Sequence, residues 1–558
     1  MITAHPGTPR TPSTPSTATR TRTFALFAVA AGLVLTTSGC GGAAAAGEDD
    51  TFVFATGKDI SCLDPHVNGD MPQASIAANY LDSLVSQDSA GAIHPWLATD
   101  WSVSEDGLTY TFTVRDDVWF TDGTKLTAEA VKANLDHMVD PDTQSGTAGG
   151  YLKPYVGTEI VDETTAVVTL NRPYAAFLEV LAQPFLGIES PEALERPQAE
   201  NCNSPVGTGP YRIVDYVPQS KVSLVRNEDY NSAPPFAQHQ GPAHIEKIEW
   251  RIVPEDSTRY GLLRAGQVDA LDLMPSVHVD EAEADPNVEL IFQDRPGNPT
   301  NLMLNTTRAP FDDLAVRKAF LRSAYVDAGI NSVYFGTVTR AGGPLSSTTG
   351  FYSPDFEHVH DPDPQEAARL LDGAGWTERD DEGYRTRDGE RLTVHFPYTP
   401  GAWPTAHQAL VTQIQATAKK AGFEVLIENG DGASVSELGN NFDYDLRSDY
   451  WNTNTADVLR IVFSSEYTES AGFVPNGSGF RNPELDAILN GALATDDPAE
   501  REDLYYRAQQ IVSDNALQLP LYHQASQVAL RKDRFGDFAL EPSLSLPYFY
   551  DVTAVDSE

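Results

Sequence analysis

The chain has 558 residues, of which 41% are hydrophobic, so it is long enough to bury more than one core, and we expect two or three domains. It carries 80 aspartate and glutamate residues against 38 lysine and arginine residues, a formal net charge of -42. A surface with this charge repels phosphate backbones, which argues against a nucleic-acid partner. It selects no ligand, however, because acidity also serves solubility.

Residues 1–39 predict a secretory signal peptide. Arg10, Arg20 and Arg22 precede an apolar run at residues 24–35, and small residues then lead to Cys40. The run is too short to span a bilayer, and no later segment of the sequence approaches the necessary apolar length. We therefore expect export followed by removal of this segment.

Gly39 and Cys40 resemble the end of a bacterial lipobox, although Thr37 stands where that motif usually has leucine. The resemblance implies that Cys40 carries a lipid, which anchors the protein on the extracytoplasmic face of the cell membrane. Secretion without a lipid is the alternative. Residues 40–50, small and then acidic, are expected to form a flexible tether.

Two further cysteines follow the tether, Cys62 and Cys202. An even pair in an oxidising compartment predicts a disulfide bond that closes a long loop. Two free, buried thiols are the alternative.

Motifs for catalysis are missing from the sequence, which has no phosphate-binding glycine loop, no His-Glu-x-x-His helix and no Gly-x-Ser-x-Gly elbow. His358 and His360 lie close to Asp361 and Asp363, but this segment precedes a helix start and is interpreted as a solvated loop. We therefore expect no enzymatic chemistry, no metal and no cofactor.

Segments typical of strands and of helices alternate along the rest of the chain. Alternating apolar residues predict strands, and Asp or Asn followed by proline predicts a helix start. The alternation is typical of an α/β fold. Strands are expected at residues 51–56, 110–115, 166–170, 222–225, 245–253 and 301–305, and helices after Thr127, before Gly266, after Asp313, and from Pro364, Pro483 and Pro498.

Several of these stretches together resemble the family 5 extracellular solute-binding proteins of ABC importers, which carry oligopeptides, dipeptides and nickel chelates. The longest agreement is at residues 95–101 (PWLATDW) and 104–115 (SEDGLTYTFTVR). The resemblance extends over roughly residues 51 to 530. Shorter matches are LDP at 63–65, FTDG at 120–123, PVGTGPY at 205–211, LRAGQVD at 263–269, LNT at 304–306, PFDD at 310–313, VRKA at 316–319, NPELD at 482–486 and PLY at 520–522.

This resemblance implies a bilobed α/β fold of the periplasmic-binding-protein type, with a hinge and an additional inserted subdomain. Two chain crossings would join the lobes, and the ligand would be buried between them when the hinge closes. We expect lobe 1 at residues 51–94, 207–298 and 530–558, the inserted subdomain at residues 95–206, and lobe 2 at residues 299–529.

The resemblance also implies which residues line the cleft. From the first lobe these are Met71 and Gln73 in an early loop, and Gln183 and Phe185 after a helix. From the second lobe they are Asp449, Tyr450, Trp451 and Asn452, in a segment expected to be a loop. Asp449 would hold a ligand amine through a charge-assisted bond, or would be a solvated acid. The two aromatic residues would offer flat apolar surface.

These expectations combine into one functional hypothesis: a monomer captures a peptide or peptide-like molecule and delivers it to the permease of an importer. The same fold could carry an oligosaccharide or a metal chelate, although no arginine occurs from Tyr174 to Glu195, where nickel-chelate carriers present one. A receptor-docking sensor and a secreted hydrolase are the alternatives from other classes.

Overall fold

The computed structural model describes residues 51–469 and 474–555. The predicted signal peptide, Cys40 and the tether to residue 50 lie outside these ranges. No helix in the described ranges is both long enough and apolar enough to cross a membrane. The described residues build two α/β lobes, each organised around its own sheet.

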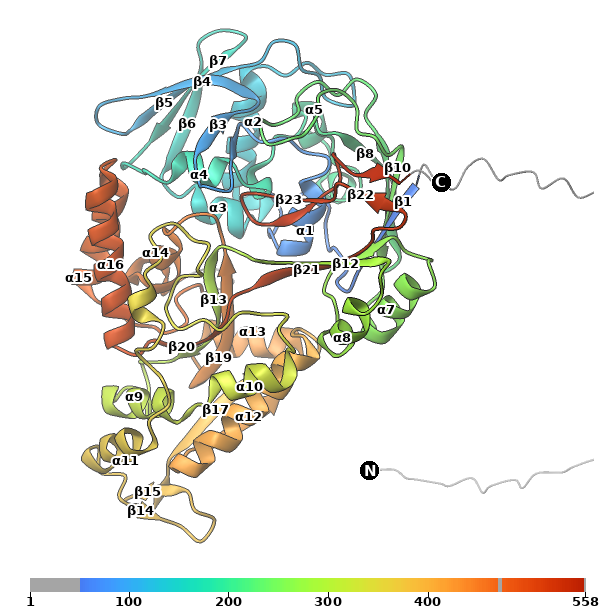
Figure 1. Cartoon of the computed structure of the whole chain (residues 1–558). Coiled ribbons are helices and arrows are strands. Elements are labelled where there is room, and N and C mark those ends of the chain that lie inside the picture. The colour runs from blue at the N-terminus through green and yellow to red at the C-terminus, as the bar shows by residue number, and fades with distance from the viewer. Residues whose placement is uncertain (1–50, 470–473, 556–558) are drawn as a thin grey trace, which may run out of the picture. The chain divides into compact units, whose positions relative to one another are not determined.

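The sheet of the first lobe collects strands from distant parts of the chain (Figure 1). β1 is parallel to both of its neighbours, and the other pairs are antiparallel. Phe52 and Phe54 of β1 are fully buried and pack against the ring of Phe549. In sheet order the strands are β12 (Val288–Asp294), β21 (Ala525–Arg531), β11 (Ala270–Leu271), β1 (Thr51–Thr56), β10 (Lys247–Ile252), β9 (Lys221–Arg226) and β8 (Tyr211–Val217).

Short elements complete the first lobe. Its helices are α1 (Met71–Ala77), α7 (Asp256–Arg264) and α8 (Val279–Glu283). Its two-stranded pairs are β2 (Val85–Gln87) with β3 (Ile93–Pro95), β22 (Phe535–Gly536) with β25 (Thr553–Ala554), and β23 (Ala539–Glu541) with β24 (Leu546–Tyr548).

A separate antiparallel sheet lies between β3 and β8 in the sequence. Its strands, in sheet order, are β4 (Ala98–Val103), β5 (Thr109–Val114), β7 (Thr165–Leu170) and β6 (Tyr155–Ile160). Tyr110, Phe112 and Val114 of β5 are buried while the threonines between them are half-buried, which is the alternation read from the sequence. The accompanying helices are α2 (Ala128–Val139), α3 (Thr147–Tyr151), α4 (Phe177–Leu181), α5 (Pro191–Leu194) and α6 (Gln198–Asn201).

The second lobe has a three-stranded sheet of β19 (Leu446–Asn452), β13 (Gly297–Leu304) and β20 (Gln518–Tyr522). The parallel pair β17 (Thr393–Tyr398) and β18 (Glu424–Asn429) lies beside β19. A small antiparallel sheet joins β14 (Glu378–Arg379), β15 (Arg385–Arg387) and β16 (Glu390–Arg391). The helices are α9 (Leu314–Ser323), α10 (Val326–Val333), α11 (Pro364–Gly373), α12 (Thr405–Ala421), α13 (Gly432–Asn440), α14 (Val458–Phe463), α15 (Pro483–Ala494) and α16 (Pro498–Asp514).

Three helices of this lobe begin where the sequence predicted. α11, α15 and α16 each start at a proline, and the preceding Asp363, Asn482 or Asp497 accepts hydrogen bonds from the first free backbone N–H groups. Proline suits this position because its missing N–H has no partner inside the helix and its φ is already helical.

Two short connections join the sheets of the two lobes: one between β12 and β13, and one between β20 and β21. They lie side by side, because the Arg295 N–H donates to the carbonyl of Gln524 at 2.6 Å and Arg295 Nε donates to Ser526 Oγ at 3.0 Å. The boundary expected between residues 529 and 530 falls inside β21, since pairing with β12 draws this strand into the first sheet from Ala525 onward.

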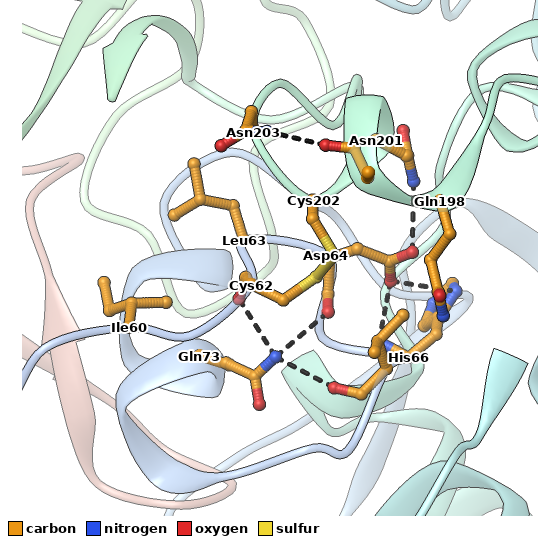
Figure 2. The surroundings of a disulfide bond; sticks show 12 residues. Ile60, Cys62, Leu63, Asp64, His66, Gln73, Gln198, Asn201, Cys202 and Asn203 are labelled. Atoms are coloured by element: carbon orange, nitrogen blue, oxygen red, sulfur yellow. Dashed lines mark hydrogen bonds and ion pairs between the residues drawn. A yellow bond between two sulfur atoms is a disulfide. The ribbon is translucent and has the colours of Figure 1, made fainter. Parts of the chain in front are cut away.

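Cys62 and Cys202 form a disulfide bond between residues 140 positions apart. The bond ties the loop before α1 to the end of α6 (Figure 2). The backbone also joins these segments, because the Leu63 N–H donates to the carbonyl of Cys202.

Candidate functional site

The second-lobe residues expected to line the cleft lie on a strand, not in a loop. β19 pairs with β13, with Trp451 opposite Asn298 and Asp449 opposite Asn301. Because side chains alternate along a strand, Tyr450 and Trp451 point to opposite faces of the sheet. The two rings therefore contact different parts of the protein and do not form one continuous apolar surface.

Trp451 contacts the inserted part of the first lobe, which is the region of the β4, β5, β7 and β6 sheet and its accompanying helices. Its Nε1–H donates to the hydroxyl of Tyr151, at the end of α3, at 3.1 Å. Its ring is half-buried and packs against the apolar clusters on both sides of this contact. Trp451 thus connects the two lobes directly.

A polar network beside this ring joins the lobes a second time. Gln183, which is fully buried, donates from Nε2 to Thr453 Oγ1 at 3.1 Å and to Asn454 Oδ1 at 2.7 Å. The Asn454 amide in turn donates to Gln87 Oε1 and to the carbonyl of Glu179. Gln183, which was expected to line the cleft, therefore contacts the second lobe directly. Its partners Thr453 and Asn454, and Gln87 beyond Asn454, were not identified from the sequence.

Asp449 is not the free carboxylate that an amine-binding role requires. Arg447, two residues earlier on the same face of β19, approaches Asp449 Oδ2 at 2.6 Å, and the Tyr450 N–H donates to Asp449 Oδ1 at 2.9 Å. Burial raises the pKa of Asp449, while the guanidinium opposes that shift. The negative charge is thus already compensated inside the second lobe.

Gln73 has a structural role instead of a ligand-binding one. Its Nε2 donates to the carbonyls of Cys62, Asp64 and Val67 (Figure 2), and its Oε1 accepts from the backbone N–H of Asp70. The side chain is fully buried and its hydrogen-bonding capacity is used within the loop before α1. The expectation that it contacts ligand is not supported by this arrangement.

The remaining expected residues are divided between core and interlobe surroundings. Phe185 is 2% exposed and belongs to the core of the inserted part, against which Met71 also packs at the start of α1. Asn452 ends β19 next to Trp451, and its Nδ2 is buried without a hydrogen-bond partner in the described residues. Asn452 can therefore still donate a hydrogen bond near the interlobe contact.

A pocket of about 290 Å³ opens at the carboxyl edge of the parallel pair β17–β18. Ligands of α/β proteins commonly bind at this edge. The lining is mainly apolar and adds two tyrosines, a tryptophan and one cation, a composition suited to a small molecule with a few polar groups. The lining residues are Pro397, Tyr398, Thr399, Ala402, Trp403, Gly432, Val435, Ser436, Gly439, Asn440, Tyr444, Arg447 and Ser448.

Trp403 links this pocket to β19. Its ring meets the Tyr450 ring edge-on at 5.6 Å and stacks on His407 at 4.4 Å. His407 is held on both sides, with Nε2 at 2.9 Å from Ser448 Oγ and Nδ1 at 3.2 Å from the Tyr522 hydroxyl. Sequence reasoning did not identify Trp403, because the loop before α12 carries no pattern that indicates a site.

The buried imidazole of His407 should make stability depend on pH. Burial lowers its pKa to about 3, so below pH 6.5 the unfolded chain takes up a proton that the folded chain refuses. The free energy of unfolding therefore contains a contribution from neutral His407 that is complete above pH 6.5. This contribution should fall by about 2 kcal/mol between pH 7 and pH 5. Urea unfolding of the wild type and of His407→Gln at both pH values measures it.

The matched control is His358→Gln, whose side chain is 86% exposed and should leave the pH slope unchanged. A His407→Gln protein that loses as much stability as the wild type between pH 7 and pH 5 would contradict the expected contribution.

The family model of the bacterial extracellular solute-binding proteins, family 5 (middle region), matches residues 92–471. Among curated proteins, the glutathione-binding protein GsiB of Salmonella typhimurium is 29% identical over 480 residues, which cover 84% of this chain and 88% of that protein. GsiB of Escherichia coli strain K12 is 29% identical over 484 residues, with the same coverage.

Solved structures agree in fold. The periplasmic binding protein DppA from Helicobacter pylori, in complex with the peptide STSA, is 25% identical with a TM-score of 0.77, covering 91% of this chain and 98% of that one. NikA from Brucella suis, in complex with Fe(III)-EDTA, is 23% identical with a TM-score of 0.78, covering 91% of this chain and all of that one. At this identity, the second likeness concerns the fold alone.

Proposed function

The chain belongs to the bacterial extracellular solute-binding proteins, family 5, and on that premise we propose that it captures a peptide or peptide-like molecule between its lobes and delivers it to an importer permease. It acts as a monomer without chemistry of its own. The family is extracytoplasmic, and the proposed capture therefore takes place outside the cytoplasm.

The interlobe contact carries this proposal. Trp451 and Asn454 from the second lobe meet Tyr151 and Gln183 from the first lobe at hydrogen-bond distance. Groups from both lobes therefore converge at a place where a ligand that contacts both lobes can stabilise the closed form. Each ~1.4 kcal/mol of such stabilisation raises the affinity tenfold. Aromatic faces and amide groups suit a peptide, whose backbone both donates and accepts hydrogen bonds.

The peptide class is further supported by relatives and by charge. The GsiB relatives are named for glutathione, a tripeptide, and DppA is solved with a peptide. Arg447 supplies a positive charge to the lining of the second-lobe pocket, and the carboxylate of Asp449 already compensates that charge. Short neutral or zwitterionic peptides suit this pocket better than strongly anionic ligands.

A thermal-shift screen of residues 41–558 tests this proposal with dipeptides, tripeptides, glutathione, oligosaccharides and metal chelates. A ligand at 100 times its dissociation constant should add ~2.7 kcal/mol of stability. Stabilisation by peptides supports the proposal. Stabilisation by sugars or chelates alone, or by none of the compounds, would overturn the peptide class.

For the compound identified, Trp451→Ala should weaken binding by about 2 kcal/mol or more, because an aromatic side chain at the centre of a closed cleft is a typical hot spot. Calorimetric titration measures the change. Trp119→Ala is the control, since Trp119 is 56% exposed in the inserted part and should leave affinity unchanged. Equal affinity of the Trp451→Ala and wild-type proteins would place the ligand elsewhere.

We further propose that Cys40 carries a lipid that holds the protein at the cell membrane. The support is the small-residue run ending at Gly39 and Cys40. Because the thiol is the attachment point, a Cys40→Ala protein should move from the membrane fraction to the medium. Immunoblots of the two fractions measure this, with Gly42→Ala as a control that keeps the cysteine. Membrane retention of Cys40→Ala would refute lipid anchoring.

A further inference from the structure

Three side chains with metal-binding groups converge beside the disulfide bond, away from the interlobe contact. Asp64 and His66 come from the loop before α1, and His137 from the last turn of α2. One ligand atom of each lies within 4.8 Å of the others. Figure 2 shows Asp64 and His66 next to the bond between Cys62 and Cys202. The sequence could not reveal the cluster, because 73 residues separate Asp64 from His137.

The hydrogen bond of His66 Nε2 to a backbone carbonyl decides which ring nitrogen faces the cluster. Its Nε2 lies 2.9 Å from the carbonyl of Gly187, and since a carbonyl only accepts, Nε2 carries the proton. Nδ1 then holds a lone pair, and it is buried without a hydrogen-bond partner in the described residues. A ring whose distal N–H is bound to a carbonyl, with its other nitrogen free, has the arrangement of metal-ligating histidines.

The distances between the ligand atoms suit a tetrahedral ion. Bonds of 2.0–2.2 Å at a tetrahedral centre place neighbouring ligand atoms about 3.3 Å apart. His137 Nε2 lies 3.4 Å from Asp64 Oδ2, and His66 Nδ1 lies 3.7 Å from Asp64 Oδ1. His137 Nδ1 also has a partner, Thr143 Oγ1 at 3.3 Å, which can hold that ring with Nε2 toward Asp64. The ligand atoms of the three residues all lie within 4.8 Å of one another, so an ion between them would draw them closer together.

A second buried carboxylate, that of Glu189, lies next to Asp64. Asn201 Nδ2 donates both to Asp64 Oδ2 at 3.1 Å and to Glu189 Oε2 at 2.8 Å. Glu189 is fully buried, and its Oε1 has no hydrogen-bond partner in the described ranges. Two carboxylates and two neutral imidazoles would balance the charge of a divalent cation, which offsets the electrostatic cost of burying both acids together.

We propose that Asp64, His66 and His137, with Glu189, bind a divalent transition-metal ion of the Zn²⁺ class. A set of two imidazole nitrogens and two carboxylate oxygens favours Zn²⁺ over Mg²⁺ or Ca²⁺, which prefer six or more oxygen ligands. The site is structural. It joins the loop before α1, α2 and the segment leading into α5, and so acts alongside the disulfide on the same part of the fold.

Zinc titration of the mature, oxidised protein tests this proposal. After treatment with EDTA and dialysis, calorimetry should find one Zn²⁺ bound per chain, and Co²⁺ should give the visible absorption of a tetrahedral site. His137→Gln should lower the Zn²⁺ affinity at least tenfold and abolish the Co²⁺ band. His94→Gln is the matched control, because His94 also faces a carboxylate, that of Asp88, but has no second histidine beside it. It should bind as the wild type does.

Two results would overturn the proposal: no stoichiometric Zn²⁺ binding by the wild type, or binding that His137→Gln leaves unchanged. Binding that survives His137→Gln and is displaced by the cleft ligand would place the ion in the cleft as cargo. If His137→Gln does not fold, the wild type alone decides, because its melting temperature should rise with Zn²⁺ and fall with EDTA. A melting temperature indifferent to both would refute the site.

Discussion

Replacing Arg460 with methionine is expected to destabilise the protein by about 3–5 kcal/mol, because it leaves a buried carboxylate without its counter-charge. Arg460 and Asp457 are each 1% exposed, and Arg460 donates from Nε and Nη2 to the two carboxylate oxygens at 2.8 and 2.6 Å. Asp457 also accepts from the hydroxyl of Tyr174, in the inserted part, at 3.2 Å. The pair therefore supports the junction between the lobes as well as α14.

Urea unfolding measures the effect, with the double variant Asp457→Leu/Arg460→Met as the matched control. Removing both charges avoids an unpaired buried ion, so the double variant should recover most of the lost stability. A single variant as stable as the wild type would mean that water reaches Asp457. A double variant no better than the single one would assign the loss to packing instead of charge.

The second large effect is expected from removing the disulfide bond. The bond closes a loop over a sequence separation of 140 residues, and constraining the unfolded chain over such a length contributes about 2–5 kcal/mol. Cys62→Ala/Cys202→Ala should lose stability within that range, measured by urea unfolding without reductant. The double replacement leaves no unpaired thiol at this site.

Reduction provides the control for this experiment. Dithiothreitol should destabilise the wild type about as much as the double replacement does, and should not affect the double variant. A double variant with wild-type stability would show that the contacts around the bond, such as the Leu63–Cys202 backbone hydrogen bond, hold these segments without it.

The sequence predicted helix starts and strand β5 correctly, because these features depend on interactions between residues close together in the chain. Proline after Asp or Asn marked the starts of α11, α15 and α16, and the alternation of Tyr110, Phe112 and Val114 marked β5. These features depend on neighbouring residues in the chain and on their period. They need no knowledge of what packs against them.

The site was predicted less well because its strand is polar. Residues 446–452 (LRSDYWN) resemble a loop, and only pairing with β13 makes them a strand. Had the strand been recognised, the spacing of Arg447 and Asp449 would have placed both on one face and predicted their ion pair. Gln183 was predicted to line the cleft, and its ligand-binding role stays a prediction; its hydrogen bond to Asn454 depends on packing between distant segments and was not predicted.

The position of β21 bears on the order in which the two lobes fold. β21 lies between β12 and β11, and its Ser526 meets Arg295 across 231 residues of sequence. As the chain is made from its N-terminus, β12 therefore has no neighbour in its sheet until nearly the whole second lobe has followed. The second lobe, whose segments lie between those two strands, can gain its structure first. During that interval the unpaired edges of β11 and β12 can pair with other chains, so the late arrival of β21 leaves the first sheet open to aggregation.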